Sequence, residues 1–147
     1  MTQSKAGWYG FAVAGLAVAI VTALVFQWLG RDVRFCRNAL SELAHGRPGA
    51  QKHLAWDRLQ VLGQDVGGFY RQLPNDVERQ QYRMAFVNRF AAGFQQAQAK
   101  AEDFDRWRIA ERQAGGVVIA ATHRKRGDTL LFLVSSRPHR IEGLQWQ

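Results

Sequence analysis

A long stretch without charged side chains near the amino terminus limits what this chain can fold into. Residues 6–30 carry no Asp, Glu, Lys or Arg, and residues 11–26 contain only Ala, Val, Gly, Leu, Ile, Thr and Phe. A helix of this composition and length matches the hydrocarbon core of a bilayer better than it matches water. The sequence therefore predicts a transmembrane helix at the start of the chain.

Two tryptophans bracket this predicted helix. At about 1.5 Å per residue, Trp8 and Trp28 are separated by roughly 30 Å, close to the hydrocarbon thickness of a bilayer. Because indole rings favour the membrane–water boundary, each tryptophan is expected at one interface. A cleaved signal peptide is the alternative, but it would have a shorter apolar core and a small-residue cleavage site. The segment that follows the apolar run supplies no such site, so we expect an uncleaved, single-pass signal anchor.

Basic residues on both sides of the anchor leave its orientation open. Arg31, Arg34 and Arg37 outnumber Lys5, which by the positive-inside rule places the following domain in the cytoplasm. A short tail with a single lysine is also typical of a bacterial signal anchor whose domain lies outside the cytoplasm.

Small residues within the anchor suggest one further interaction. Gly15, Ala19 and Ala23 recur at four-residue spacing, which would let two such helices approach closely and form a homo-oligomer. The alternative is chance, because this spacing arises easily in an alanine-rich segment.

The segments after the anchor have helical patterns. Residues 31–46 are expected to form a juxtamembrane helix that ends at Gly46, before Pro48. Residues 50–62 and 65–73 resemble short helices packed at the end of a core.

The strongest pattern outside the anchor is an aromatic stripe at helical spacing. Asn75 and Glu78 resemble a capping box, which predicts the start of a long helix. One face of that helix carries aromatic rings at every fourth position, which is typical of a side that packs on a core. These residues are Tyr82, Phe86, Phe90 and Phe94.

Beyond Lys100 the pattern changes to that of strands. Four strands are predicted, at residues 104–112, 117–123, 129–135 and 139–146. The short turns between them predict an antiparallel meander, with a bulge at Gly143 that returns Ile141, Leu144 and Trp146 to one face. The expected fold is α+β: a transmembrane helix, short helices, one long amphipathic helix, and a curved four-stranded antiparallel sheet bent around that helix. The corresponding segments are the tail and anchor at 1–30, the juxtamembrane helix at 31–46 and a cone domain at 47–147.

This element order resembles the nuclear-transport-factor-two-like, or cystatin-like cone, superfamily over residues 38–147. The resemblance lies in the aromatic stripe, in the apolar strands around Ile119 and Phe132, and in the terminal segment 140–146. It implies a membrane-anchored bacterial domain of the kind that acts in envelope assembly or secretion, and it favours an extracytoplasmic position. Enzymes of this superfamily, such as ketosteroid isomerase, imply a cone-shaped pocket with a carboxylate base as the alternative.

Few residues in the sequence fit catalytic chemistry. Glu111 and His123 are placed symmetrically about Gly115 and could face each other as a general acid and base, although an exposed cross-strand pair is the simpler interpretation. The four histidines lack metal-ligand spacing on one element, and glycine-rich phosphate loops are missing, so neither a metal nor another cofactor is expected.

Two groups of residues are candidates for binding. A pocket between the long helix and the sheet would be lined by Tyr82, Phe86, Phe90, Trp107 and Phe132. A cationic end of the sheet could be formed by Arg124, Lys125, Arg126, Arg137 and Arg140, and the alternative is that these are solvated charges of the hairpin turns. The excess of 20 Lys and Arg over 12 Asp and Glu gives a formal charge of +8, which favours anionic partners without identifying one.

We therefore expect a membrane-anchored, non-catalytic domain of the bacterial inner membrane that contacts the lipid bilayer and binds an envelope protein. The alternative is a small-molecule pocket, possessed by an isomerase-like or hydratase-like enzyme. Nucleic-acid binding would require a cytoplasmic domain, and the basic turn lacks the exposed aromatic residues that stack on single strands, so no nucleic-acid partner is expected.

Overall fold

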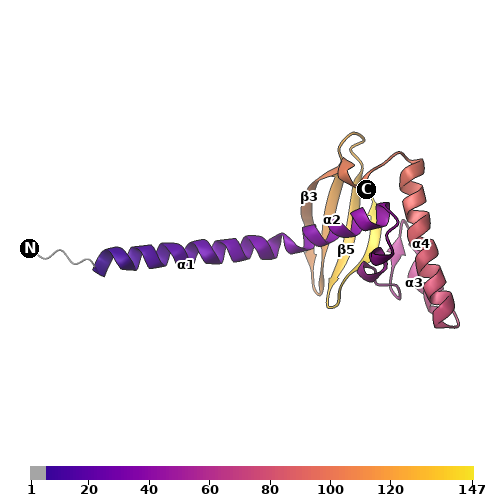
Figure 1. The fold of residues 1–147 in the computed structure, drawn as a ribbon, viewed down its shortest axis with the longest axis horizontal. Helices are drawn as coiled ribbons and strands as arrows, with labels where there is room; N and C mark the ends of the chain where they lie inside the picture. The colour runs from indigo at the N-terminus through magenta and orange to yellow at the C-terminus, as the bar shows by residue number, and fades with distance from the viewer. Residues whose placement is uncertain (1–5) are drawn as a thin grey trace, which may run out of the picture. The chain divides into compact units, whose positions relative to one another are not determined.

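The computed structural model describes the backbone of residues 6–147 and the side chains of residues 14–28 and 30–147. The helices are α1 (Ala6–Leu29), α2 (Arg31–Ala44), α3 (Val66–Arg71) and α4 (Asp76–Gln96), with two short 3-10 helices, η1 (Pro48–His53) and η2 (Ala101–Asp103). The strands are β1 (Gln60–Val61), β2 (Gln64–Asp65), β3 (Phe104–Gln113), β4 (Gly116–His123), β5 (Thr129–Ser136) and β6 (His139–Trp146). This is an α+β fold with a long apolar helix at its amino-terminal end (Figure 1). Contacts divide it into two compact units, Met1–Arg31 and Asp32–Gln147.

The α1 helix presents apolar side chains to its surroundings. Leu16, Val18, Leu24 and Phe26 are all more than half exposed. By length and composition, one helix among the described residues, Ala14–Ala44, contains a stretch able to cross a membrane, and none of that stretch is buried inside the chain. A core helix of a soluble protein would be buried, whereas membrane anchors and signal sequences share these properties. Trp28 is 64% exposed, and the Trp8 side chain lies outside the described residues.

The α2 helix belongs to the core of the second unit. Cys36, Ala39, Leu40 and Leu43 lie on one face of this helix and are all 0% exposed. They share one apolar cluster with the inward-facing residues of the sheet, and Figure 1 shows α2 lying across the sheet. The helix ends at Ala44, just before the predicted stop at Gly46, whose φ of 65° suits glycine. The helix predicted at 31–46 is thus present, and from Asp32 onward it belongs to the second compact unit.

The sheet has six strands and is mixed, so the prediction of a purely antiparallel sheet of four strands is wrong. Two short strands, β1 and β2, are added to the four predicted ones. Its order is β2-β1-β6-β5-β4-β3, and β1 pairs with β6 in parallel. Residues on both sides of β1 bond to β6: the Ala55 amide before it donates to the Ile141 carbonyl, and the Leu62 amide after it donates to the Leu144 carbonyl. The helix predicted at 50–62 is thus replaced by η1, a turn at residues 56–58 and β1, because β6 would otherwise leave its backbone groups unpaired along one edge.

The predicted meander itself is confirmed. The strands β3 to β6 pair antiparallel in sequence order, within one residue of the expected bounds. The predicted bulge is also present: Leu133 pairs with Gly143 and Val134 pairs with Ile141, which leaves Glu142 as the extra residue. Ile141 and Leu144 are consequently both buried in the core.

The long helix α4 is confirmed, but its position differs from the prediction. Asn75 caps it, with its side-chain oxygen accepting the Glu78 amide at 2.9 Å. The aromatic stripe packs against the core cluster, yet only Val87 and Ala91 of this helix are buried. The face of the sheet is therefore covered by α2, and α4 lies to one side (Figure 1). The sequence pattern alone did not distinguish the two helices, because the stripe on α4 is longer and more aromatic than the short apolar face of α2.

This assignment of the central helix predicts a difference between two truncations. Leu43→Ala should lower the free energy of unfolding by about 2–5 kcal/mol, because it opens a cavity in a fully buried site. Val77→Ala, on α4 at 65% exposure, should change the free energy by less than about 0.5 kcal/mol. Denaturant unfolding of the full chain in detergent, followed by near-ultraviolet circular dichroism, measures both. Equal costs for the two substitutions would contradict a core built on α2.

Candidate ligand pocket

A pocket of about 360 Å³ opens between the carboxyl-terminal half of α4 and the end of the sheet. This volume is near the lower end of the range for small-molecule sites, roughly 300–1,000 Å³. Its walls come from α4, from β6, from the β4–β5 turn and from the segment that precedes β3. The lining is mostly apolar, with four polar or charged residues: Arg89, His123, Arg126 and Asp128.

Aromatic rings form a continuous wall of this pocket. The Phe90 and Phe94 rings stack with centroids 5.2 Å apart. Phe94 is 6.2 Å from Phe104, which in turn is 6.0 Å from Trp146. Trp146 is still 50% exposed, so the wall extends to the mouth of the pocket.

His123 contributes to the pocket wall from the end of β4, and its ring is held by the protein. It is 5% exposed and stands edge-on to Phe104 at 5.3 Å. Its Nδ1 accepts the backbone amides of Lys125 and Arg126 at 3.3 and 3.2 Å, which leaves Nε2 to carry the hydrogen of the neutral ring. Nε2 lies 3.9 Å from an oxygen of Asp103. With both ring nitrogens directed at protein groups, His123 organises the β4–β5 turn.

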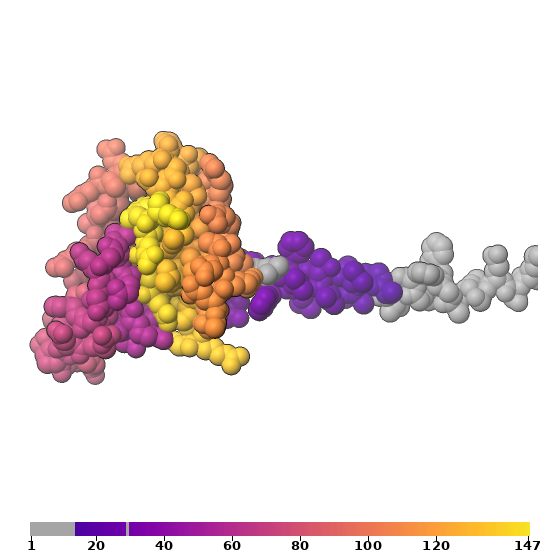
Figure 2. Space-filling view, turned by 180° about the vertical axis from the view of Figure 1, so that it is seen from behind, coloured from indigo at the N-terminus to yellow at the C-terminus, as the bar shows by residue number. Residues whose placement is uncertain are grey.

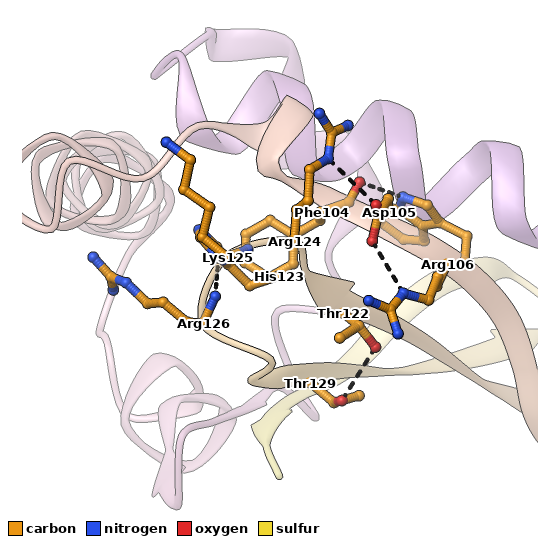
Figure 3. Close-up of polar contacts among 10 residues, drawn as sticks. Phe104, Asp105, Arg106, Thr122, His123, Arg124, Lys125, Arg126 and Thr129 are labelled. Carbon is orange, nitrogen blue, oxygen red and sulfur yellow. Dashed lines mark hydrogen bonds and ion pairs between the residues drawn. The ribbon is translucent and has the colours of Figure 1, made fainter.

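The β4–β5 turn brings charge to the pocket (Figure 3). Arg124 points away and donates to Asp105 at 3.3 Å, whereas Arg126 reaches α4 and donates to the Ala97 carbonyl at 2.7 Å. Arg89 approaches from α4 and makes no hydrogen bond or ion pair with the residues the structure describes. Asp128 is the one carboxylate in the lining, and its side chain is exposed.

Leu62 sits at the mouth of the pocket in an unusual conformation. Its φ is 50°, which lies in the left-handed region that residues other than glycine rarely adopt. Its side chain is 52% exposed. The hydrogen bond from its amide to the Leu144 carbonyl, 2.8 Å long, fixes its backbone against β6. An apolar side chain is thus held at the pocket mouth despite local strain.

The five predicted pocket residues do not share one cavity. Phe90 alone lines the pocket described above. Tyr82 and Phe86 pack around Trp56, at ring distances of 6.4 and 5.3 Å. Trp107 contacts the fully buried Phe132 at 5.5 Å and borders a separate polar pocket beside α2.

The hydroxyl of Tyr82 is held in its protonated form. Burial raises the pKa of its hydroxyl above the ordinary value, an effect that the nearby Arg89 charge opposes. The hydroxyl therefore stays protonated at neutral pH, and it lies outside the pocket lining.

The predicted cationic end of the sheet is not formed. Arg124, Lys125 and Arg126 lie in the β4–β5 turn, whereas Arg137 lies in the β5–β6 turn and Arg140 lies at the start of β6. Successive turns of a meander alternate between the two ends of a sheet, so the two groups are separated by the length of β5. The prediction treated neighbouring turns in the sequence as neighbours in space.

The predicted pair of Glu111 and His123 is also separated. His123 is opposite Phe104 in the register, and Glu111 is opposite Val118. Two bulges in β3 shift the register, and the remaining five-residue offset along β4 corresponds to roughly 17 Å. A general acid and base cannot cooperate directly over this distance.

Other histidines make structural contacts that the sequence did not reveal. The His139 ring is 2.7 Å from Asp32, and the His53 ring is 3.1 Å from Glu42, so two pairs link α2 to β6 and η1. Phe35 touches both rings, at 4.1 and 5.3 Å. Within the described part of the chain, no group of three His, Cys, Asp or Glu side chains is arranged to hold a metal ion.

Two helical glycines test whether the pocket is open. A Cβ added at Gly93 in the pocket lining meets nothing within 4 Å, so Gly93→Ala should stabilise α4 by about 0.5–1 kcal/mol through helix propensity. A Cβ added at Gly67 in α3 would lie 2.7 Å from the Asp57 carbonyl, so Gly67→Ala should destabilise the domain. Unfolding midpoints in denaturant measure both changes. Destabilisation by both substitutions would show that the space beside Gly93 is filled.

Comparisons with known proteins do not identify a relative of this chain. No protein-family model matches the chain, and searches of curated proteins and of solved structures find no significant match.

Proposed function

We propose that this chain is a membrane-anchored, non-catalytic domain that binds another protein of the bacterial envelope and helps to assemble a complex. In this proposal α1 is a single-pass anchor in the inner membrane, and the second unit is extracytoplasmic. The resemblance to the nuclear-transport-factor-two-like superfamily is the basis for the envelope placement, and an anchor that is apolar along its described length supports membrane attachment.

The observation that carries the proposal is an apolar patch on the outer face of the sheet. Val118 pairs with Leu133 and Ala120 pairs with Leu131 across β4 and β5. Along β4 and β5 these four residues alternate with residues of the core cluster, such as Ile119 and Phe132. Because successive side chains of a strand point to opposite faces, the four point away from α2. Leu131 and Leu133 are half-buried and form the accessible part of this patch, whereas Val118 and Ala120 are buried, at 8% and 0% exposure. Figure 2 shows β3 to β6 as the surface of this face.

Charged residues border this outer-face patch. Arg108 is opposite Ala120 and Glu111 is opposite Val118 in the register, and both charged side chains are exposed. An apolar centre with a polar rim is the usual anatomy of a protein-binding surface.

The edges of the sheet favour binding through the face. β3 is the long edge strand, but it contains two register irregularities, and Arg106 at the first of them has a φ of 50°. The opposite edge, β2, is two residues long. Bulges, charges and short edge strands all disfavour the addition of a strand from another chain. A partner would therefore pack against the outer-face patch.

The non-catalytic part of the proposal is supported by the pocket chemistry. An enzyme of the isomerase type needs a carboxylate in an apolar site. The carboxylate of the pocket, Asp128, is exposed, and both nitrogens of His123 face protein groups.

A second candidate function is the binding of a small molecule, and the 360 Å³ pocket with its aromatic wall favours it. The two functions use opposite faces of the sheet, so one chain could perform both.

Affinity purification of the tagged full chain from detergent-solubilised membranes tests the protein-binding proposal. A companion protein recovered with the natural chain should be reduced at least tenfold by Leu133→Glu and by Leu131→Glu, because each places a charge in the patch. Val77→Glu adds the same charge at an exposed apolar site on α4 and should leave recovery unchanged.

Each variant is first shown to unfold at the same denaturant concentration as the natural chain. Equal recovery with the patch and control variants, or no stable companion, would contradict the proposal.

A further inference from the structure

We propose that the pocket between α4 and the sheet binds a small ligand with an apolar body and one anionic group, of the aryl or short-chain alkyl carboxylate class. The proposal rests on the second candidate function, that this pocket accepts small molecules, and it is independent of protein binding by the outer-face patch.

The apolar body of the ligand follows from the walls. Phe90, Phe94, Phe104 and Trp146 supply connected ring faces and edges, and Gly93 leaves open space in the wall formed by α4. Aromatic walls of this kind favour planar or flexible apolar groups over polar ones. A volume of about 360 Å³ limits the ligand to a small ring system or a short chain.

The anionic group follows from the charges on the same lining. Two arginines line the pocket, Arg89 from α4 and Arg126 from the β4–β5 turn, against a single carboxylate, that of Asp128. Arg126 is held in place by the Ala97 carbonyl at the end of α4 through one of its nitrogens, which leaves its other donors available. Guanidinium groups recognise carboxylates through paired hydrogen bonds.

The same charges exclude other ligand classes. Aromatic rings also attract cations, but the two arginines would repel a cation that entered this pocket. Asp128 would repel a second anionic group, which favours a ligand with one negative charge. A neutral apolar molecule would contact the apolar walls without using the free donors of the two guanidinium groups.

Photoaffinity labelling of the full chain in phosphatidylcholine nanodiscs tests this assignment. The anionic probe is 4-benzoylbenzoate, and 4-(hydroxymethyl)benzophenone is its neutral counterpart. We expect the anionic probe to label residues 90–99 and 140–147, as located by peptide mass spectrometry, at a concentration about tenfold below that required by the neutral probe. Octanoate or 2-naphthoate should displace it, and octanol should not; displacement by one acid and not the other assigns the alkyl or the aryl subclass.

Matched variants distinguish the contribution of the pocket volume to probe binding from the contribution of the arginine charges. Gly93→Leu should abolish labelling by both probes, because its side chain enters the pocket, whereas Ala92→Leu on the exposed neighbouring position should not. Arg89→Gln should weaken the anionic probe several-fold and leave the neutral probe unchanged. This substitution removes no hydrogen bond to the described residues, so it keeps the fold intact. The double change with Arg126→Gln should weaken the anionic probe further.

Two results would overturn the ligand class in distinguishable ways. If both probes label the pocket equally and Gly93→Leu blocks both, the pocket binds small molecules but has no preference for an anion. If labelling is confined to other segments or is unaffected by Gly93→Leu, the pocket does not accept ligands and the second candidate function fails as well.

Discussion

The burial of one face of α2 under the concave side of the sheet is the interaction on which the rest of the domain depends. The four residues on its inward face, from Cys36 to Leu43, are fully excluded from water. They belong to the same apolar cluster as Phe132, Ile119 and Ile141 of the sheet. Burying such side chains contributes roughly 1.5–3 kcal/mol each for the larger ones. Residues of the first helix after the long apolar helix α1 therefore form the centre of the core.

The position of α2 determines what the other elements can do. Because α2 occupies the concave face, α4 packs beside the sheet and its aromatic stripe is covered only in part. The uncovered end of that stripe, from Phe90 to Phe94, becomes a wall of the ligand pocket. On the other face, β4 and β5 present a small apolar patch. Both candidate binding surfaces thus follow from the packing of α2 against the sheet.

Local patterns in the sequence predicted the elements well, and long-range pairings account for the errors. The cap at Asn75, the four strands of the meander and the bulge beside Gly143 each depend on residues close together in the chain. The pairing of Gln60 with Gly143 joins distant segments and involves a strand of only two residues, which has no detectable periodicity. The pocket could not be found for the same reason: Phe90, His123 and Trp146 become neighbours only after folding. Their residue types alone gave no signal that distinguished them from ordinary core residues.

Site-specific cross-linking in intact cell membranes tests the central claim, that the outer face of the sheet is a protein-binding surface of a membrane-anchored domain. A photoreactive amino acid at position 133 lies in the middle of the patch, and the same group at position 77 lies on an exposed part of α4. The account predicts one discrete protein adduct from position 133, recovered in the membrane fraction, and none from position 77. The absence of an adduct from position 133, or the same adducts from both positions, would contradict it.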